Sequence, residues 1–357
     1  MIDYKFRAKL PPLARRFRRV LYRVGGRRAK YGILAADRFI PCRAAMTAPS
    51  LPSVPRLGFI GAGRLARCLA RRFAQAGFPV VAIASRSPAS AQALAAQIDG
   101  CVAAASAQAV VDAADLIFVT VSDDGIGPVS ASLRFDPARA PAQALVHCSG
   151  ASSVELLAPA RAQQAQTGGF HPLYLFGGGD ADLTRIEGCS VTIEADGTLR
   201  PVLDALAAAL GCHPLAIPSG GRMLYHAAAH YAASFALCGL AEAVALWRQL
   251  GMDEADALRA LLPMLSGTIE TARDKGLANA LAGPVSRGDA GIVERQLALL
   301  DELGDDHAVL YALMTRRAVG LARRREAPPA GLDALAGSVD ALLASHLVRP
   351  APARREP

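Results

Sequence analysis

The chain has 357 residues, of which 52% are hydrophobic, and carries a formal net charge of +8. This length and apolar content allow a sizeable core and suggest two domains. Residues 1–45 hold thirteen Lys and Arg against two Asp, a net charge of +11, so the remaining residues are mildly acidic. The excess of positive charge lies in this N-terminal extension. This argues against nucleic acid or a membrane surface as a partner of the folded body.

The extension, residues 1–50, contains no apolar run long enough for a secretory signal or a membrane span. It is expected to be disordered or to lie outside the working protein, with Met46 as the suspected start. A basic interaction arm and an Arg-rich targeting segment stay open as alternatives. Residues 347–357 are predicted to form a disordered tail.

The seven cysteines are scattered, and no close pair has the spacing of metal ligands, so no metal site is predicted. An odd number of cysteines without a signal peptide indicates reduced thiols and a cytoplasmic location.

Short apolar runs alternate with helical stretches from Arg56 onward, which is typical of a doubly wound α/β sheet. Strands are expected at 57–60, 80–84, 116–121, 144–147, 169–171, 190–193 and 214–217. Helices are expected among them at 64–76, 89–98, 154–164 and 199–210.

The run Pro218-Ser219-Gly220-Gly221 is the sharpest break in the chain, and no strand pattern follows it. Helices are predicted beyond it at 222–250, 253–266, 268–281, 290–302, 305–324 and 331–345. The predicted fold is therefore an N-terminal Rossmann-type doubly wound sheet over 51–218, followed by an all-helical C-terminal domain over 219–346 for substrate binding and dimerisation.

A glycine-rich loop follows the first expected strand and opens the first helix; it reads Gly61-Ala62-Gly63-Arg64-Leu65-Ala66. In this pattern Gly61 permits a tight turn, Gly63 lets the backbone approach a pyrophosphate, and Ala66 lets the helix pack close to the strand. The pyrophosphate then lies on free N–H groups at the helix N-terminus. Because strand and helix both flank the loop correctly, an incidental glycine turn is the weaker interpretation.

The second strand ends in Ser85-Arg86-Ser87, with no acidic residue in reach. Proteins that bind NAD place Asp or Glu at this point to hold the ribose hydroxyls. An Arg and two hydroxyls instead suit a 2′-phosphate through charge-assisted hydrogen bonds. The predicted cofactor is NADP; a solvated Arg in a surface turn is the alternative.

Two further loops follow buried strands and are predicted to line the cofactor crevice, because ligands bind beyond the carboxyl ends of parallel strands. The first contributes Val121, Ser122 and Asp123, and the second contributes Ser149 and Gly150. Asp123 or Asp124 is alternatively the N-cap of a helix over 126–133.

Several motifs resemble a bacterial family of Rossmann-like oxidoreductases with a C-terminal domain of unknown function, related to 6-phosphogluconate dehydrogenase and ketopantoate reductase. The matching segments span roughly residues 56–325 and are 58–66, 121–126, 147–151, 169–173, 225–229 and 280–289. The resemblance implies an NADP-dependent oxidoreductase with its active site between two domains.

The chain departs from this family at two positions. Members usually carry Lys before the Tyr-His pair and Asn a few residues after it, where this chain has Arg222 and Phe235. Because Arg does not lose its proton at working pH, Arg222 can polarise an oxygen but is a poor proton donor.

Hydride transfer to a carbonyl or imine requires a proton for the reduced heteroatom, and histidine is the best-suited donor near neutral pH. Arg222, His226 and His230 are four residues apart and share one helix face. We expect His226 to be the acid and Arg222 to anchor an anion, with His171 as a second candidate donor. Structural roles for these histidines, for His230 above all, are the alternative; a zinc site formed by the three lacks support from their spacing.

The sequence therefore predicts an NADP(H)-dependent oxidoreductase of a small carbonyl, hydroxy acid or imine, acting as a homodimer. A non-catalytic NADP(H)-binding regulator or scaffold is the second hypothesis, prompted by Arg222 and Phe235. A reductase that uses a deazaflavin on the same fold is the third.

Overall fold

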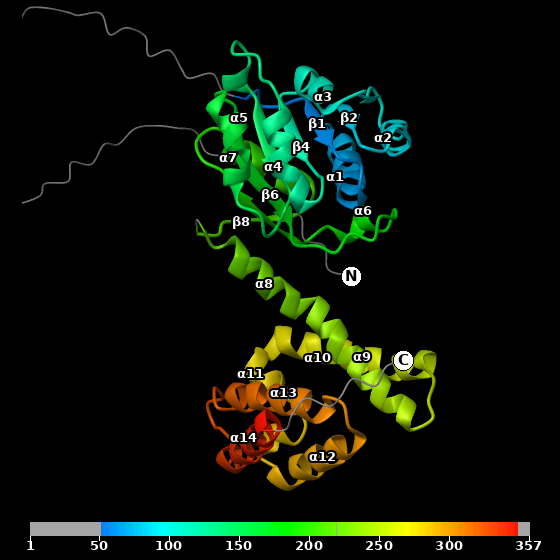
Figure 1. The fold of residues 1–357 in the computed structure, drawn as a ribbon, viewed down its shortest axis with the longest axis vertical. Coiled ribbons are helices and arrows are strands. Elements are labelled where there is room, and N and C mark those ends of the chain that lie inside the picture. The colour runs from blue at the N-terminus through cyan, green and yellow to red at the C-terminus, as the bar shows by residue number, and fades with distance from the viewer. Residues whose placement is uncertain (1–50, 219, 349–357) are drawn as a thin grey trace, which may run out of the picture. The chain divides into compact units, whose positions relative to one another are not determined.

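The computed structural model describes residues 51–218 and 220–348 (Figure 1). The predictions for the basic extension, for Met46 as the start and for the C-terminal tail fall on residues outside these ranges.

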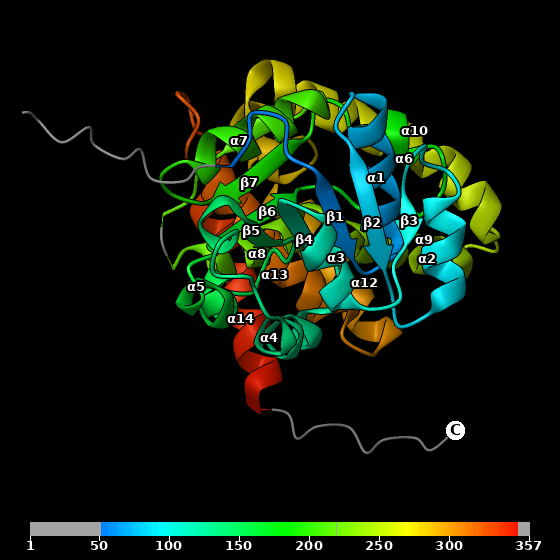
Figure 2. The same cartoon turned by 90° about the horizontal axis from the view of Figure 1, so that it is seen from above.

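One eight-stranded sheet organises the first part of the described chain, in the order β3-β2-β1-β4-β5-β6-β7-β8. All neighbouring strands are parallel except β6 and β7, which are antiparallel. Figure 2 shows the strands side by side. The strands are β1 (Leu57–Ile60), β2 (Val80–Ala84), β3 (Val102–Ala103), β4 (Leu116–Val119), β5 (Ala144–His147), β6 (Gln166–Pro172), β7 (Ser190–Glu194) and β8 (His213–Leu215).

Helices cover both faces of this sheet, which explains why the central strands are apolar throughout. On one face α1, α2 and α7 pack against Phe59, Phe118 and Phe170; on the other, α3, α4 and α5 pack against Ile117 and Leu145. These helices are α1 (Arg64–Gln75), α2 (Pro88–Ala95), α3 (Ala107–Ala113), α4 (Asp123–Ser132), α5 (Ala158–Ala162), α6 (Asp182–Arg185) and α7 (Leu199–Ala209). The predicted Rossmann-type fold is confirmed.

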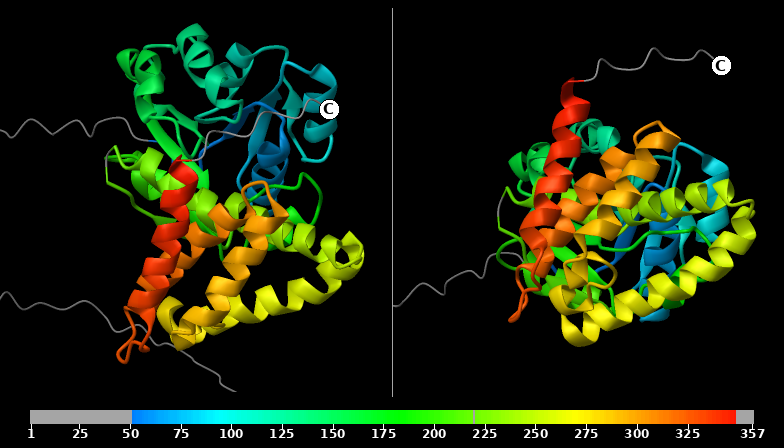
Figure 3. Two further views of the ribbon diagram at one scale, coloured as in Figure 1. Left: turned by 60° about the horizontal axis from the view of Figure 1, so that its bottom comes forward. Right: turned by 90° about the horizontal axis from the view of Figure 1, so that it is seen from below.

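In the described residues that follow β8, the regular elements are all helices. They are α8 (Arg222–Ala232), α9 (Ser234–Gln249), α10 (Glu254–Lys275), α11 (Leu277–Ala280), α12 (Ala290–Leu303), α13 (His307–Ala322) and α14 (Leu332–Val348). Helices α12, α13 and α14, orange to red in Figure 3, share a core that includes Val293, Val319 and Val339. The predicted all-helical C-terminal region is thus confirmed, whereas its boundary at residue 219 stays a prediction.

Four predicted helices differ from the structure. The helix expected over 154–164 is a 3-10 turn (Val154–Leu157) followed by α5, because Pro159 lies at the second position of α5 and restarts the helix there. The helix expected over 222–250 breaks at Ala233, whose φ of −117° and ψ of −81° are not helical. The two helices expected over 253–281 are instead the continuous α10 and the short α11, because a single Gly267 costs a helix only about 1 kcal/mol relative to Ala.

The segment Arg222–Gln249, which comprises α8 and α9, is long and apolar enough by composition to cross a membrane, and only 6% of its most apolar window is buried. A single such segment is weak evidence for a membrane span. Its first residue, Arg222, is buried and paired with Glu194 of β7, as described below.

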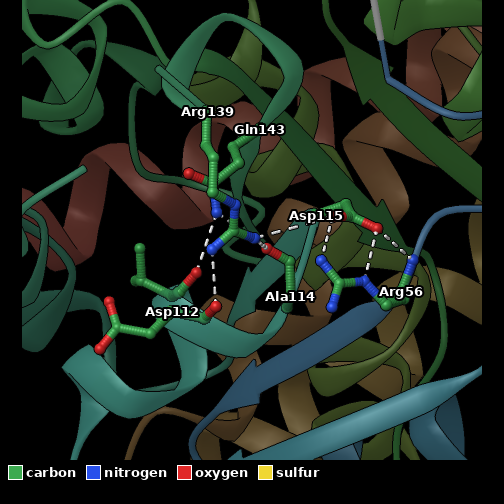
Figure 4. Close-up of polar contacts among 7 residues, drawn as sticks. Arg56, Asp112, Ala114, Asp115, Arg139 and Gln143 are labelled. Carbon is green, nitrogen blue, oxygen red and sulfur yellow. Dashed lines mark hydrogen bonds and ion pairs between the residues drawn. The ribbon is translucent and has the colours of Figure 1, made fainter. Parts of the chain in front are cut away.

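The amino ends of β1, β4 and β5 are joined by a polar network (Figure 4). Asp115 accepts hydrogen bonds from the backbone N–H of Arg56 (3.0 Å) and from its Nε (3.0 Å) and Nη2 (2.7 Å). Gln143 Nε2 donates to the carbonyls of Val111 (2.9 Å) and Ala114 (2.8 Å), and Arg139 Nη1 donates to the carbonyl of Asp112 (2.6 Å). The opposite, carboxyl end of the sheet holds the candidate site.

Candidate functional site

Gly61 turns the chain sharply at the end of β1. Its φ is +115°, and a Cβ there would lie 2.6 Å from the carbonyl oxygen of Thr120, so only glycine fits. Gly61 N–H donates to the carbonyl of Ala84 at 2.7 Å, and Thr120 Oγ1 donates to the carbonyl of Gly61 at 3.0 Å. The loop is therefore tied to the carboxyl ends of both β2 and β4.

The first turn of α1 has the features that a pyrophosphate requires. Gly63 is its N-cap, no side chain caps it, and a Cβ on Gly63 would meet nothing within 4 Å. No side chain thus caps the N–H groups of this turn, and the space beside Gly63 is open. Arg64 is exposed and Ala66 is fully buried where α1 packs on the sheet. These residues fit a dinucleotide.

The turn after β2 contains Ser85, Arg86 and Ser87, and β2 pairs with β1, the strand that leads into the glycine-rich loop. Ser85 is half-buried, whereas Arg86 and Ser87 are exposed. Ser87 is the N-cap of α2: its Oγ accepts from Ser90 N–H at 3.4 Å, and its own N–H donates to Ser85 Oγ at 3.3 Å. The Ser87 hydroxyl is therefore partly committed to the helix, and Arg86 is the group best able to reach a phosphate.

The loops after β4 and β5 lie at the same edge of the sheet. Helix α4 begins at Asp123 with Ser122 as its N-cap, so the interpretation of Asp123 or Asp124 as the N-cap was wrong. Both carboxylates instead lie in the first turn, where the helix dipole favours negative charge. Ser149 Oγ accepts from the N–H groups of Ala151 (3.2 Å) and Ser152 (2.9 Å), which shapes the turn after β5.

His171 lies near the carboxyl end of β6 and meets Tyr225 of α8. His171 Nδ1 and Tyr225 Oη are 3.0 Å apart, within hydrogen-bonding distance. Burial, with help from the charge of Arg222, lowers the pKa of His171 to about 4, so the imidazole is neutral at neutral pH. Burial also raises the pKa of Tyr225. The pair can therefore pass a proton between neutral groups.

His226 faces the same space as His171, and Gly150 makes room for both. The His171 and His226 ring centroids are 6.3 Å apart, and those of His226 and His230 are 4.9 Å apart. A Cβ on Gly150 would lie 2.7 Å from a ring carbon of each of His171 and His226. The structure thus brings the predicted catalytic histidines together over the turn after β5.

Arg222, by contrast, is 4% exposed and enclosed by the sheet. Its Nε donates to Glu194 Oε2 at 2.5 Å, and its Nη1 donates to the carbonyl of Ser149 at 2.6 Å. A Cβ on Gly169 would lie 1.9 Å from Nη2, so glycine is required where the guanidinium lies on β6. Since its charge is balanced by Glu194, Arg222 fastens α8 to β5, β6 and β7.

His147, the last residue of β5, is fully buried near these groups. Its Nδ1 accepts from Ser149 N–H at 3.2 Å, and its Nε2 has no hydrogen-bond partner among the described residues. Burial, followed by the charges of Arg222 and His171, lowers its pKa to about 3. Arg222 Nη2 is likewise buried without a partner. His147 Nε2 and Arg222 Nη2 are therefore two buried nitrogens at this end of the sheet without a hydrogen-bond partner among the described residues.

A cavity of about 360 Å³, here called the histidine pocket, opens beside this cluster. Among the described residues, no group of three or more His, Cys, Asp or Glu has the geometry of a metal site. The pocket is lined by His171, Leu173, Tyr174, Leu175, His226, Ala229, His230, Ala232, Ala233 and Ser234.

Three contributors to this arrangement were not assigned a role from the sequence. Thr120 could have been noticed as a hydroxyl that directly follows a buried strand. Tyr225 was noticed in a motif but could not be paired with His171, which is 54 residues away in the chain. Glu194 carries no local signal, because its pairing with Arg222 arises from the position of α8.

Two family models match parts of the chain. Residues 56–148 match the model described as NADP oxidoreductase coenzyme F420-dependent, and residues 189–318 match a domain of unknown function (DUF2520). A search of curated proteins gives no significant match. Residues 56–148 are thus similar to the Rossmann domain of NADP oxidoreductases, while the relation to 6-phosphogluconate dehydrogenase and ketopantoate reductase stays a prediction.

Solved structures share the fold. The protein TM1727 from Thermotoga maritima is 24% identical with a TM-score of 0.61, and the match covers 75% of this chain and 100% of that one. BF3122 from Bacteroides fragilis, provisionally described as an NADP oxidoreductase, is 22% identical with a TM-score of 0.58, covering 74% and 98%. A reductive aminase from Aspergillus terreus, solved with NADPH and ethyl-5-oxohexanoate, is 18% identical with a TM-score of 0.54, covering 82% and 94%.

Proposed function

We propose that the protein is an NADP(H)-dependent reductase of a small carbonyl or imine, with its site at the carboxyl end of the sheet. The proposal is based on one observation: the glycine-rich loop and the His171–Tyr225 pair lie at the same edge of the sheet. The glycine cradle of Gly61 and Gly63 follows β1, and the His171–Tyr225 pair stands at the end of β6, in the same sheet. Open α/β sheets bind dinucleotides and their substrates at this edge.

The cofactor would be held by the protein at two points. The pyrophosphate would accept hydrogen bonds from the first turn of α1, beside Gly63. The 2′-phosphate would pair with Arg86, supported by Ser85 and Ser87. Arg64, Leu65, Val121, Ser122, Asp123, Ser149 and Gly150 would form the remaining walls. The first family model and the NADPH-bound reductive aminase support NADP as the cofactor.

When bound, NADPH supplies a hydride to the carbonyl or imine carbon and becomes NADP, and the heteroatom requires one proton. His171 supplies that proton from Nε2 while its Nδ1 takes the proton of the Tyr225 hydroxyl. Because the lowered pKa keeps His171 neutral, this relay needs no charged imidazole. Tyr225, half-buried, is reprotonated from solvent. His226 faces the same atoms and orients the heteroatom.

Arg222 acts in this proposal as a positioning residue instead of an anion anchor. Its Nε and Nη1 are bound to Glu194 and to the carbonyl of Ser149, and these bonds hold the start of α8, from which Tyr225 and His226 project. The position that carries lysine in the resembling family holds a buried arginine in this chain. This difference supports the second candidate, a non-catalytic NADP(H)-binding regulator. Turnover of any carbonyl or imine by the natural chain would exclude that candidate.

The test has two stages on the full chain. Thermal-shift titrations with NADPH, NADP, NADH and NAD are expected to show stabilisation by the phosphorylated pair only, of about 2.7 kcal/mol at a hundredfold excess over Kd. Deazaflavin coenzyme F420 is included because the matching model is named for it. NADPH oxidation is then followed with ketones, aldehydes and cyclic imines. Binding without any turnover would leave the regulator as the function.

We also propose that the protein is a homodimer in the cytoplasm. Helices α8 and α9 expose large apolar side chains that a monomer would leave in water: Met223, Leu224, Tyr231, Phe235 and Leu237. A concentration of exposed apolar side chains of this kind is typical of an interface. Sedimentation equilibrium should give twice the chain mass, and Leu224→Glu should give the monomer. A monomeric natural chain that co-sediments with lipid vesicles would instead favour a membrane-bound surface.

A further inference from the structure

The histidine pocket shows what kind of substrate it can hold. Besides three imidazoles and the Ser234 hydroxyl, its lining is aliphatic or aromatic: Leu173, Tyr174, Leu175, Ala229, Ala232 and Ala233. No Lys, Arg, Asp or Glu lines the cavity among the described residues. A carboxylate or phosphate placed in it would lose water without gaining a permanent opposite charge, which is unfavourable.

The nearest fixed cation does not change this balance. Arg222 is 4% exposed and does not line the cavity, and its Nε and Nη1 are bound to Glu194 and to the carbonyl of Ser149. Its Nη2 has no partner among the described residues but lies against Gly169 of β6. Burial lowers the pKa of His171, so that ring is neutral at neutral pH. His226 and His230, whose ring centroids are 4.9 Å apart, contribute imidazoles and no permanent charge. The pocket therefore has no built anion site.

The apolar wall is fixed in place by a buried carboxylate. Asp182, 5% exposed, accepts from Tyr174 Oη (3.0 Å), Gly177 N–H (3.2 Å) and Gly178 N–H (2.7 Å). Burial alone would raise the pKa of Asp182, but these hydrogen bonds keep it below the usual value. The loop of residues 173–182 is thus closed on itself.

One side of this loop lines the histidine pocket and the other contacts the dinucleotide loop. Leu175 lines the pocket although it is 70% exposed to solvent. Gly178, with a φ of +89°, lies against Arg64: a Cβ there would come within 2.6 Å of Arg64 Cγ. A substrate held near the cofactor would therefore contact this apolar wall.

We propose that the histidine pocket takes an uncharged, apolar ketone or imine and discriminates against substrates that carry a carboxylate or phosphate. Leu175 and Leu173 contact the apolar part of the substrate, and Asp182 positions them. This inference rests on the proposed reductase function and narrows it, since hydroxy acids and keto acids are no longer expected substrates.

The test uses pairs of compounds that differ in one charge. The ethyl ester of levulinic acid is compared with free levulinate, and methylpyrroline with pyrroline carboxylate, each with NADPH and the full chain. The uncharged member should have a kcat/KM at least about a hundredfold higher, because a charged group in such a pocket lacks a partner. A carboxylate that is turned over as well as or better than its uncharged partner overturns the inference and leaves the reductase function standing.

Variants that place a positively charged side chain in the lining of the histidine pocket test the same inference. Leu175→Arg and, from the opposite wall, Ala232→Arg should each reduce the preference for the uncharged compound by at least tenfold; two variants guard against a folding failure in one. Leu215→Arg, at another exposed leucine outside the pocket, is the matched control and should leave the preference unchanged. An unchanged preference in both folded pocket variants would contradict the proposal.

Binding is measured separately from turnover, by thermal shift in the presence of NADP. If neither member of a pair is reduced but the ester stabilises the complex and the acid does not, the substrate class stands and the reductase function fails. If NADP binds and neither compound adds stabilisation or turns over, the inference is wrong.

Discussion

The polar side chains at the two ends of the sheet differ in how fully they are hydrogen-bonded. At the amino end, the side chains of Arg56, Asp115, Arg139 and Gln143 satisfy one another and the neighbouring carbonyls (Figure 4). At the carboxyl end, His147 Nε2 and Arg222 Nη2 are buried without a partner. Buried polar groups are normally paired, and these two unpaired groups lie beside the site that we propose. One end of the sheet ties neighbouring strands together, and the other is where we propose that the cofactor and substrate bind.

The largest expected effect is a loss of kcat when a proton donor at the carboxyl end of the sheet is removed. Tyr225→Phe removes the hydroxyl that lies 3.0 Å from His171 Nδ1 and should lower kcat by about a hundredfold or more, as loss of a general acid does. The Kd for NADPH should not change. Tyr231→Phe, on the exposed face of the same helix, is the control and should retain full activity. Equal activity in the two variants would remove Tyr225 from the mechanism.

A stability measurement separates the buried ion pair of the carboxyl end from surface pairs. Arg222→Met leaves Glu194 without its partner and should lower the free energy of unfolding by about 3 kcal/mol, the low end for a broken buried pair because Glu194 is partly exposed. Arg248→Met breaks an exposed pair with Glu254 and should cost under about 0.5 kcal/mol. Urea unfolding measures both. Similar losses would show that Arg222 does not fasten α8.

The amino end should affect stability and not binding. Burial tends to raise the pKa of Asp115, but the hydrogen bonds from Arg56 hold it below its usual range. Asp115→Ala removes those bonds and should cost about 1–2 kcal/mol of unfolding free energy. The NADPH Kd of the folded variant should equal that of the natural chain. A large change in Kd would mean that the two ends of the sheet are coupled.

The last expected effect is a pH dependence of stability to which two buried histidines of the carboxyl end contribute. His147 and His171 have pKa values of about 3 and about 4 in the folded protein, against 6.5 for the ordinary side chain. The unfolded chain therefore binds more protons below pH 6.5, and stability falls as the pH decreases from there towards these folded values. Each histidine contributes a slope of up to about 1.4 kcal/mol per pH unit.

Replacing one histidine tests this slope. His171→Gln should remove its share between about pH 6.5 and pH 5, so the difference in unfolding free energy between variant and natural chain should shrink steadily on acidification. Urea midpoints at several pH values provide the measurement. A constant difference across this range would mean that His171 titrates normally in the folded protein.

Sequence patterns predicted the parts of this molecule that depend on neighbours in the chain. The bounds of β1, β2 and β5 follow from short apolar runs ended by polar or glycine residues, and they agree with the structure. Gly61 could be recognised because strand, turn and helix are contiguous. The break at Ala233 carried no such signal, since neither proline nor glycine marks it.

The candidate site could be predicted only in pieces, because its pairs are distant in sequence. Arg222 and Glu194 are 28 residues apart, and their contact depends on Gly169 of a third element. Helix periodicity placed Arg222 and His226 on one face and suggested one shared role, whereas burial separates them: Arg222 is enclosed and His226 lines the pocket. The helical period predicts which residues share a face of a helix, but not how deeply each side chain is buried.

The most direct test of the central claim compares two glycines. A Cβ on Gly63 or on Gly267 would meet nothing within 4 Å, so Gly63→Ala and Gly267→Ala should both fold. Only the first places a methyl group where the pyrophosphate must approach. Isothermal titration with NADPH should show at least a tenfold weaker Kd for Gly63→Ala, about 1.4 kcal/mol, and an unchanged Kd for Gly267→Ala. Equal affinities in the two variants would contradict the placement of the cofactor at the carboxyl end of the sheet.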